Sequence, residues 1–333
     1  MKIAVIGAGA IGGYVAHALA SAGEDVTVVA RGANLAAIRR HGLKRIAADG
    51  SESTAALAAT DDYAAAGVQD VVILAMKAQQ VEAILDRLPL LIGPETMVVP
   101  MQNGIPFWYF HEHGGALAGS VVRSVDPHGR LAATIPAAQV IGCVVYPAAE
   151  LVAPGVIRHV EGERFPLGEL DGRASTRVQR LSDAFQRGGL KAPVLADIRA
   201  ELWLKLWGNA SFNPISALTR ATLVDLCRFE PTRMLATGMM REMQAIAATL
   251  GITIRVSIER RIAGAQSVGA HKTSMLQDIE AGRETEIDAL VGSVIELGRM
   301  TGMPTPQLDA VYALVKLLEA APARARAPLL AAA

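Results

Sequence analysis

The hydrophobic and polar positions in the first part of the chain follow a strand pattern and a helix pattern in turn. Short apolar runs at residues 2–6, 25–30, 71–75 and 96–101 predict strands, with helical patterns at 14–22 and 34–40. The runs at 71–75 and 96–101 are continuously apolar, which is typical of strands buried on both faces of a parallel sheet. This alternation predicts an α/β fold with a doubly wound sheet of Rossmann type.

A second group of runs predicts further β structure. The runs at 43–47 and 54–58 are separated by Asp49-Gly50, a hairpin-type turn signal, and indicate a small excursion at the sheet. Residues 140–146 and 156–160 predict strands joined by a turn at Pro154-Gly155. A short β run at 167–169 and an amphipathic helix at 177–187 follow.

From residue 198 onward only helical patterns remain. They cover residues 198–211, 231–250, 258–265, 274–279, 285–299 and 307–318. The change from alternating elements to helices alone places a domain boundary near residue 197. In a chain of 333 residues we therefore expect an α/β domain at 1–197 and an all-α domain at 198–333.

The loop after the first predicted strand carries the most specific motif of this part. Gly7, Gly9 and Gly12 have the G-x-G-x-x-G spacing, between strand and helix, that is typical of dinucleotide binding. We expect Gly7 to allow a sharp turn, Gly9 to allow the approach of a pyrophosphate and Gly12 to allow close helix packing. We also expect that a side chain at any of the three would fill space that a phosphate needs. Backbone N–H groups at Ala10 and Ile11 then help to hold the anion. The alternative is a glycine turn required by packing alone.

The end of the second predicted strand distinguishes the two nicotinamide cofactors. An NAD site would carry Asp or Glu here to bind the ribose 2′-hydroxyl, but the residues are Ala30, Arg31 and Gly32. Arg31 offers a planar cation that suits a 2′-phosphate. We therefore predict NADPH/NADP, and the alternative interpretation of Arg31 is a solvated arginine at a strand end.

Polar residues follow the next two predicted strands. Lys77 comes two residues after one of them, and Asn103-Gly104 follows the other. Ligands of open α/β sheets bind outside the carboxyl ends of the strands, so we expect Lys77 and Asn103 to contact cofactor or substrate. The alternatives are a surface lysine that opens a helix and an asparagine that only forms a turn.

Residues 105–138 lose clear periodicity and gather aromatic residues and histidines, including the run 107–110 and the pair His111-x-His113. We expect the aromatic side chains to cover the active site or to form an oligomer contact. No third ligand lies at a convincing spacing from the two histidines, so we expect exposed loop histidines and no metal site.

The composition excludes several classes of partner. Lys plus Arg and Asp plus Glu both number 32, so no net charge attracts nucleic acid or an anionic membrane. Cys143 and Cys227 are too few and too far apart for a disulfide framework, and free thiols suit a reducing compartment. No stretch reaches the roughly 18 to 20 apolar residues of a membrane span, and the three spaced glycines argue against a signal peptide. We expect a cytoplasmic protein, and the oligomeric state stays open, a homodimer included.

The stretch 198–214 places several polar groups on one helical face. Lys205, Asn209 and Asn213 are spaced by four residues, opposite a buried side that includes two tryptophans. Pro214 should kink or end the helix close to these amides. A structural alternative for Lys205 is an ordinary i,i+4 ion pair with Glu201.

Two capping-box spacings occur later in the chain. They pair Ser274 with Gln277 and Thr285 with Asp288, and capping alone could explain both hydroxyls. It does not explain Glu286, which would be the first helical residue, where the macrodipole favours a carboxylate.

Taken together, these motifs resemble those of the ketopantoate reductases (2-dehydropantoate 2-reductases). The resemblance rests on order and spacing over nearly the whole chain: the glycine loop, Arg31, Lys77-Ala78-x-Gln80, Asn103-Gly104, the run 199–214, the run 274–278 and the run 285–288. It implies an NADPH-binding Rossmann domain, an all-helical domain and a small 2-oxo acid held in the cleft between them. The implied reaction is reduction of 2-dehydropantoate to (R)-pantoate, a step of pantothenate and coenzyme A biosynthesis.

The resemblance also assigns roles to individual residues. It implies that Lys205 is the general acid and that Glu286 assists it. It implies that Asn103, Asn209, Asn213 and Ser274 hold the substrate, while Arg31 and Lys77 contact the cofactor. The residue types suit the reaction, because the alkoxide that forms at C2 needs a proton donor and hydrogen bonds.

One region departs from the family pattern and leaves the substrate open. The segment after Gly104 is long and aromatic, and the Thr-rich run expected at the next strand is replaced by residues 143–147, Cys-Val-Val-Tyr-Pro. A relative that reduces another 2-oxo acid with NADPH is therefore the second interpretation. A nucleotide-binding module without turnover is the third, from another class of function.

Overall fold

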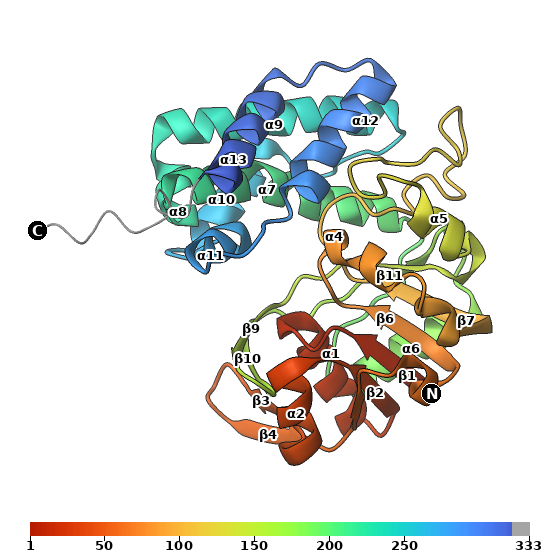
Figure 1. Cartoon of the computed structure of the whole chain (residues 1–333). Helices are drawn as coiled ribbons and strands as arrows, with labels where there is room; N and C mark the ends of the chain where they lie inside the picture. The colour runs from red at the N-terminus through yellow and green to blue at the C-terminus, as the bar shows by residue number, and fades with distance from the viewer. Residues whose placement is uncertain (322–333) are drawn as a thin grey trace, which may run out of the picture. The chain divides into compact units, whose positions relative to one another are not determined.

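The computed structural model describes residues 1–321, which divide into two compact units (Figure 1). The N-terminal unit contains Met1–Val121 and Asp126–Glu201, and the C-terminal unit contains Val122–Val125 and the chain from Leu202. The division thus falls inside helix α7 (Ile198–Thr219), whereas the sequence pattern predicted a boundary at 197. The functional roles assigned to the two domains stay predictions.

A five-stranded parallel sheet organises the N-terminal unit. Its strand order is β5-β2-β1-β6-β7, and every neighbouring pair is parallel. The strands are β1 (Lys2–Ile6), β2 (Asp25–Val29), β5 (Ala58–Thr60), β6 (Gln69–Leu74) and β7 (Ile92–Pro100). Apolar side chains of β1 and β6 are fully buried, as their continuous runs predict. The Rossmann-type α/β fold is confirmed.

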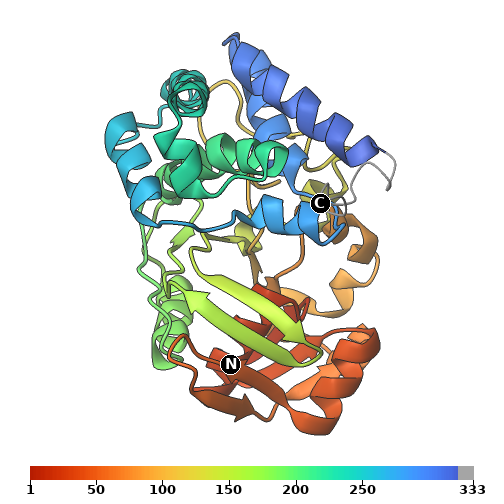
Figure 2. The same ribbon diagram turned by 90° about the vertical axis from the view of Figure 1, so that its left-hand side faces the viewer.

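A second sheet covers helix α1 (Ala10–Ser21) in the same unit (Figure 2). Its order is β4-β3-β10-β9, and the predicted hairpin of β3 (Leu43–Ile46) and β4 (Glu52–Ala55) is confirmed within it. Helix α1 packs closely here: a Cβ added at Gly13 would lie 2.6 Å from the Ile157 side chain. The hairpin belongs to a sheet of its own and is not an excursion of the parallel sheet.

The predicted pairing across the Pro154-Gly155 turn is wrong. The turn joins β9 (Ala148–Ala153) to β10 (Val156–Glu161), while β8 (Ile141–Cys143) pairs with β11 (Leu167–Glu169). Strand β9 is an edge strand, with Leu151 and Val152 44% and 39% exposed. Helix α6 (Thr176–Arg187) forms as predicted.

The aromatic run 107–110 is part of the core and is not a cover or an exposed contact surface. Its four side chains are at most 4% exposed. The guanidinium of Arg199 donates to the carbonyls of Tyr109 (2.9 Å), Leu170 (2.7 Å) and His111. A half-buried cation thus holds the segment against the start of α7, which the local sequence pattern could not reveal.

The two histidines that follow are half-buried against these rings, which corrects the expectation of exposed loop residues. The His111 ring meets Phe107 edge-on at 6.1 Å, and the His113 ring lies 5.2 Å from Phe110. Burial and the nearby charge of Arg199 lower the pKa of His111. Within residues 1–321, no three side chains of His, Cys, Asp or Glu gather as metal ligands would.

The C-terminal unit is helical in its described part, as predicted. It contains most of α7, then α8 (Leu223–Arg228), α9 (Glu230–Thr249), α10 (Ile258–Ser267), α11 (Ser274–Glu280), a π-helical turn (Asp288–Gly292), α12 (Ser293–Thr301) and α13 (Pro306–Ala320). Helix α8 was not predicted, and it has only six residues. Helix α7 runs through Pro214 to Thr219, so of the two outcomes predicted at the proline, a kink or an end, the end is wrong. Ile215 and Ala217 beyond it are fully buried, and this packing outweighs the missing hydrogen bond.

A buried histidine of α1 makes stability depend on pH. His17 is 2% exposed, and its Nε2 lies 3.1 Å from Ser53 Oγ. Burial, with a smaller effect of the Arg45 charge, lowers the pKa of His17 from 6.5 to about 4. Between these values the unfolded chain binds a proton that the folded chain excludes. Lowering the pH from 6.5 towards 4 should therefore cost up to about 3 kcal/mol of stability through this residue.

Urea unfolding of wild type and His17→Gln across this pH range measures the effect. The wild type should lose more stability than the variant as the pH falls, because only the wild type has the buried histidine. All other titrating groups are the same in the two proteins. Parallel pH profiles for the two proteins would contradict the expectation.

Candidate functional site

The glycine loop follows β1 at the carboxyl edge of the parallel sheet. Gly7 has φ +100°, a conformation that favours glycine, and its N–H donates to the Val29 carbonyl at 3.0 Å. A Cβ at Gly12 would lie 1.9 Å from the Gly7 carbonyl oxygen, and one at Gly7 would lie 3.0 Å from the Ala75 carbonyl oxygen. These two glycines are needed by the chain's own packing, so the expectation that a side chain at any of the three glycines would fill phosphate space is wrong for them. At Gly9 a Cβ would meet nothing within 4 Å.

The start of α1 suits an anion. Gly9 is the N-cap, no side chain caps the helix, and its first turn holds no acidic residue. Helix N-termini offer several N–H groups without intrahelical partners, together with the positive end of the dipole. The amides of Ala10, Ile11 and Gly12 belong to this first turn, where a pyrophosphate would be held.

Asn34 supports the loop and was missed at the sequence level. Its Nδ2 donates to the Ala8 carbonyl at 2.6 Å, and its Oδ1 accepts from the Gly155 N–H at 2.6 Å. One side chain thus connects the glycine loop, helix α2 (Gly32–His41) and the turn before β10. Both contacts are with residues remote in sequence, so the local pattern around Asn34 gave no signal of this role.

The remaining predicted cofactor residues share the same sheet edge. Arg31 is exposed and lies two residues after β2, as the N-cap of α2. Lys77 is half-buried as the N-cap of α4 (Ala78–Val81), and Asn103 is half-buried just after β7. Gln102 ties the ends of β6 and β7 together by donating to the Leu74 carbonyl at 2.7 Å and the Met76 carbonyl at 3.0 Å. Because β2, β1, β6 and β7 are adjacent, these residues and the glycine loop lie along one edge.

In the C-terminal unit, α7 presents the predicted polar stripe. Lys205 and Asn209 are half-buried, and Asn213 is 6% exposed. On the other side of the helix Trp203 and Trp207 are fully buried, and the Trp207 indole N–H donates to the Met240 carbonyl at 2.7 Å. This anchor fixes the rotation of α7 and hence the direction of the stripe.

Ser274 meets the stripe and does not cap α11. Thr273 is the N-cap, and its Oγ1 accepts from the Leu276 N–H at 3.3 Å. The capping role expected for Ser274 is therefore wrong. Its exposed hydroxyl instead accepts from Asn213 Nδ2 at 3.5 Å, which brings two predicted substrate residues together.

Helix α13 holds the segment that carries Glu286. Glu319 accepts from the Thr285 N–H and hydroxyl at 2.9 and 2.7 Å, and Asp288 accepts from the Tyr312 hydroxyl at 2.6 Å and Lys316 at 3.0 Å. Both of these contacts tie Asp288 to α13. The predicted helix 285–299 consists of a π-helical turn at Asp288–Gly292 followed by α12. Such turns are frequent at functional sites. Glu286 is half-buried within this braced segment.

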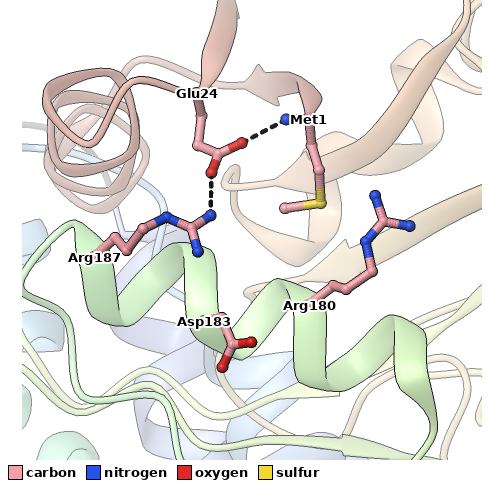
Figure 3. A pocket seen from close by; sticks show the side chains of 5 residues that line it. All are labelled: Met1, Glu24, Arg180, Asp183 and Arg187. Atoms are coloured by element: carbon pink, nitrogen blue, oxygen red, sulfur yellow. Dashed lines mark hydrogen bonds and ion pairs between the residues drawn. The ribbon is translucent and has the colours of Figure 1, made fainter.

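A pocket of about 280 Å³ lies away from these groups, at the amino edge of the sheet (Figure 3). The N-terminal ammonium group and Arg187 both contact Glu24, at 2.5 and 2.6 Å. These cations lower the pKa of the Glu24 carboxyl despite its burial. The pocket contains none of the predicted site residues, so we interpret it as a structural ion cluster.

Comparison with known proteins adds the family. Residues 3–172 match the family model described as Ketopantoate reductase PanE/ApbA, and residues 197–319 match the one described as Ketopantoate reductase PanE/ApbA C terminal. A 2-dehydropantoate 2-reductase of Mesorhizobium japonicum is 54% identical over 319 residues, which cover 96% of this chain and 98% of that protein.

Solved structures agree with this match. A Ralstonia solanacearum protein described as a candidate ketopantoate reductase has a TM-score of 0.91 and 44% identity, covering 95% of this chain and 97% of its own. The 2-dehydropantoate 2-reductase of Methylococcus capsulatus has a TM-score of 0.81 and 29% identity, covering 99% of both chains. Among the described residues, no helix has the length and apolar character to span a membrane.

Proposed function

Because the chain belongs to the ketopantoate reductase family, we propose that it reduces 2-dehydropantoate to (R)-pantoate with NADPH. The observation that carries this proposal is the relative of the same named activity, 54% identical over almost its whole length. The polar stripe of α7 supplies side chains of the types that the reaction needs.

The family uses a nicotinamide cofactor, which supplies a hydride to C2 of the substrate. As the C2–H bond forms, the carbonyl π electrons move to oxygen, and Lys205 gives that oxygen a proton. Asn209, Asn213 and Ser274 hold the substrate, and Asn103 adds an amide from the N-terminal unit. Glu286 assists Lys205 from the segment that α13 braces.

The assay is NADPH oxidation, followed by absorbance, with 2-dehydropantoate as the substrate. Turnover with product identified as (R)-pantoate supports the proposal. Parallel assays with other 2-oxo acids test the second interpretation, because a much higher kcat/KM for one of them would replace the proposed substrate. Binding of NADPH without consumption by any of them would identify a non-catalytic module.

The preference for NADPH is assigned to Arg31. Arg31→Ala should raise KM for NADPH about 10- to 100-fold and change KM for NADH little, because a charge-assisted hydrogen bond to the 2′-phosphate contributes about 1.5–3 kcal/mol. Arg40→Ala removes an exposed arginine from the same helix and serves as the matched control. Equal losses with both cofactors would contradict a 2′-phosphate contact.

A further inference from the structure

We propose that two copies of this chain associate through α13, each packing its α13 antiparallel against that of the partner about a two-fold axis. The proposal goes beyond the proposed function and does not depend on it. Three observations carry it: an exposed apolar patch on α13, the self-complementary order of its residues, and the position of two charged residues beside it.

Helix α13 is apolar on two faces. Its inner face packs into the C-terminal unit through Leu308, Val311 and Val315, which are at most 2% exposed. Its outer face carries exposed alanine and leucine side chains within about a third of the helix circumference, which we call the α13 patch: Ala310, Ala313, Leu314, Leu317 and Ala320.

The α13 patch is more than a scatter of surface side chains. Leu314 and Leu317 are 53% and 67% exposed, and they are neighbours on the helix because they are three residues apart. Single exposed apolar residues are normal, but a helix that is apolar on both faces is normally buried on both. The patch therefore suits a surface that another molecule covers.

The order of small and large residues makes the patch complementary to itself. A two-fold axis between Ala313 and Leu314, perpendicular to the helix, places Ala310 directly opposite the partner's Leu317, and this contact occurs twice. Near the axis Ala313 meets the partner's Ala313 on one side of the contact, and Leu314 meets the partner's Leu314 on the other. Small residues opposite large ones allow two helices to pack closely, and an isologous interface requires this reciprocity.

Two charges along one edge of the patch fit the same arrangement. Asp309 and Lys316 lie on the same edge, and their side chains are 49% and 43% exposed. In the antiparallel pair Asp309 comes beside the partner's Lys316, and the pair is repeated at the other end of the contact. Both residues also have partners within the chain, Arg299 at 3.8 Å and Asp288 at 3.0 Å, respectively. The added pairs therefore select the direction of packing more than they increase affinity.

The length of α13 indicates a dimer of moderate affinity. The helix has 15 residues and is therefore about 22 Å long. One pair of helices of this length is small compared with the roughly 1,200–2,000 Å² that stable interfaces bury in total. We therefore expect a dissociation constant in the micromolar range, with monomer and dimer in exchange.

Sedimentation equilibrium over low to high micromolar concentrations of the full chain tests the association. The wild type should pass from monomer to dimer as its concentration rises. Leu317→Lys should raise the dissociation constant about 100-fold or more, because each dimer loses two buried leucines and gains two charges in an apolar contact. Leu90→Lys changes a leucine of the N-terminal unit that is 46% exposed, and it should leave the dissociation constant unchanged. Thermal unfolding checks that both variants are folded.

Disulfide cross-linking tests the antiparallel direction. The native Cys143 and Cys227 are buried, so mild oxidation with oxidised glutathione acts on an introduced surface thiol. Ala313→Cys should form a covalent dimer, because the two copies of this position meet at the axis. Ala310→Cys alone should not, but a mixture of Ala310→Cys and Leu317→Cys at high concentration should form a mixed disulfide.

Three results would overturn the proposal. A wild type that stays a monomer at every concentration has no such dimer, and the α13 patch would then belong to a partner of another kind. A dimer that Leu317→Lys leaves intact uses another surface. Efficient self-linking by Ala310→Cys would mean that the two helices are parallel.

Discussion

Replacing Lys205 with alanine is expected to lower kcat about 10²- to 10⁴-fold while the affinity for NADPH stays unchanged. General acid catalysis by a positioned side chain contributes a factor of this size. Lys205 is half-buried on the stripe that also carries Asn209 and Asn213. If it is the general acid proposed above, its loss removes the proton donor for the C2 oxygen, where charge develops. Stopped-flow measurement of a single turnover isolates this step from product release.

Two further variants separate proton donation from charge and from folding. Lys205→Arg keeps a cation that is a poor acid near neutral pH, so KM for the substrate should recover more than kcat does. Lys191→Ala removes an exposed lysine of the N-terminal unit and should change neither constant. A primary alkylamine added to Lys205→Ala should restore part of the rate. If Lys205→Ala retains full single-turnover activity, Lys205 is not the acid.

The elements that could be predicted from sequence are those whose own pattern determines their partners. Continuous apolar runs within strands β1, β6 and β7 are buried, and such runs are typical of the interior of a parallel sheet. The hairpin of β3 and β4 carries its turn in Asp49-Gly50. In these places the local sequence was sufficient to predict the structure.

The errors occur where a distant partner decides the outcome. Strand β9 was not predicted from its own residues, and its pairing with β10 defines it. The aromatic run 107–110 resembles an exposed cover until Arg199 is seen to bind its carbonyls. Helix α7 should end at Pro214 by local rules, yet buried residues on both sides of the proline keep it continuous.

The candidate site divides in the same way. The stripe of Lys205, Asn209 and Asn213 follows from a spacing of four within one helix. The contacts around the candidate site do not, because Asn34 supports the glycine loop and Trp207 orients α7 through partners that are remote in sequence. The sequence therefore predicts the arrangement of polar groups on one helix more readily than the distant contacts that hold that helix in place.

Gly12→Ala should abolish cofactor binding and destabilise the N-terminal unit by about 1–3 kcal/mol or more. The new Cβ would lie 1.9 Å from the Gly7 carbonyl oxygen and 2.8 Å from the Ala75 Cβ. The oxygen belongs to the backbone, so the clash can be relieved only by moving α1 away from the turn, which is an overpacking cost. That movement also withdraws the helix N-terminus from the pyrophosphate. Urea unfolding and NADPH fluorescence titration measure the two effects.

Substitutions at two other glycines separate the loss of cofactor binding from the loss of stability. At Gly9 a Cβ would meet nothing within 4 Å, so Gly9→Ala should weaken NADPH binding with little loss of stability, because only a bound phosphate would occupy that space. Gly264 in α10 also has open space around it and is the control, since alanine there should stabilise the helix by roughly 0.5–1 kcal/mol. If Gly12→Ala has the same stability to urea and the same affinity for NADPH as the wild type, the close contact at Gly12 does not hold α1. That contact then cannot be what orients the helix towards the cofactor.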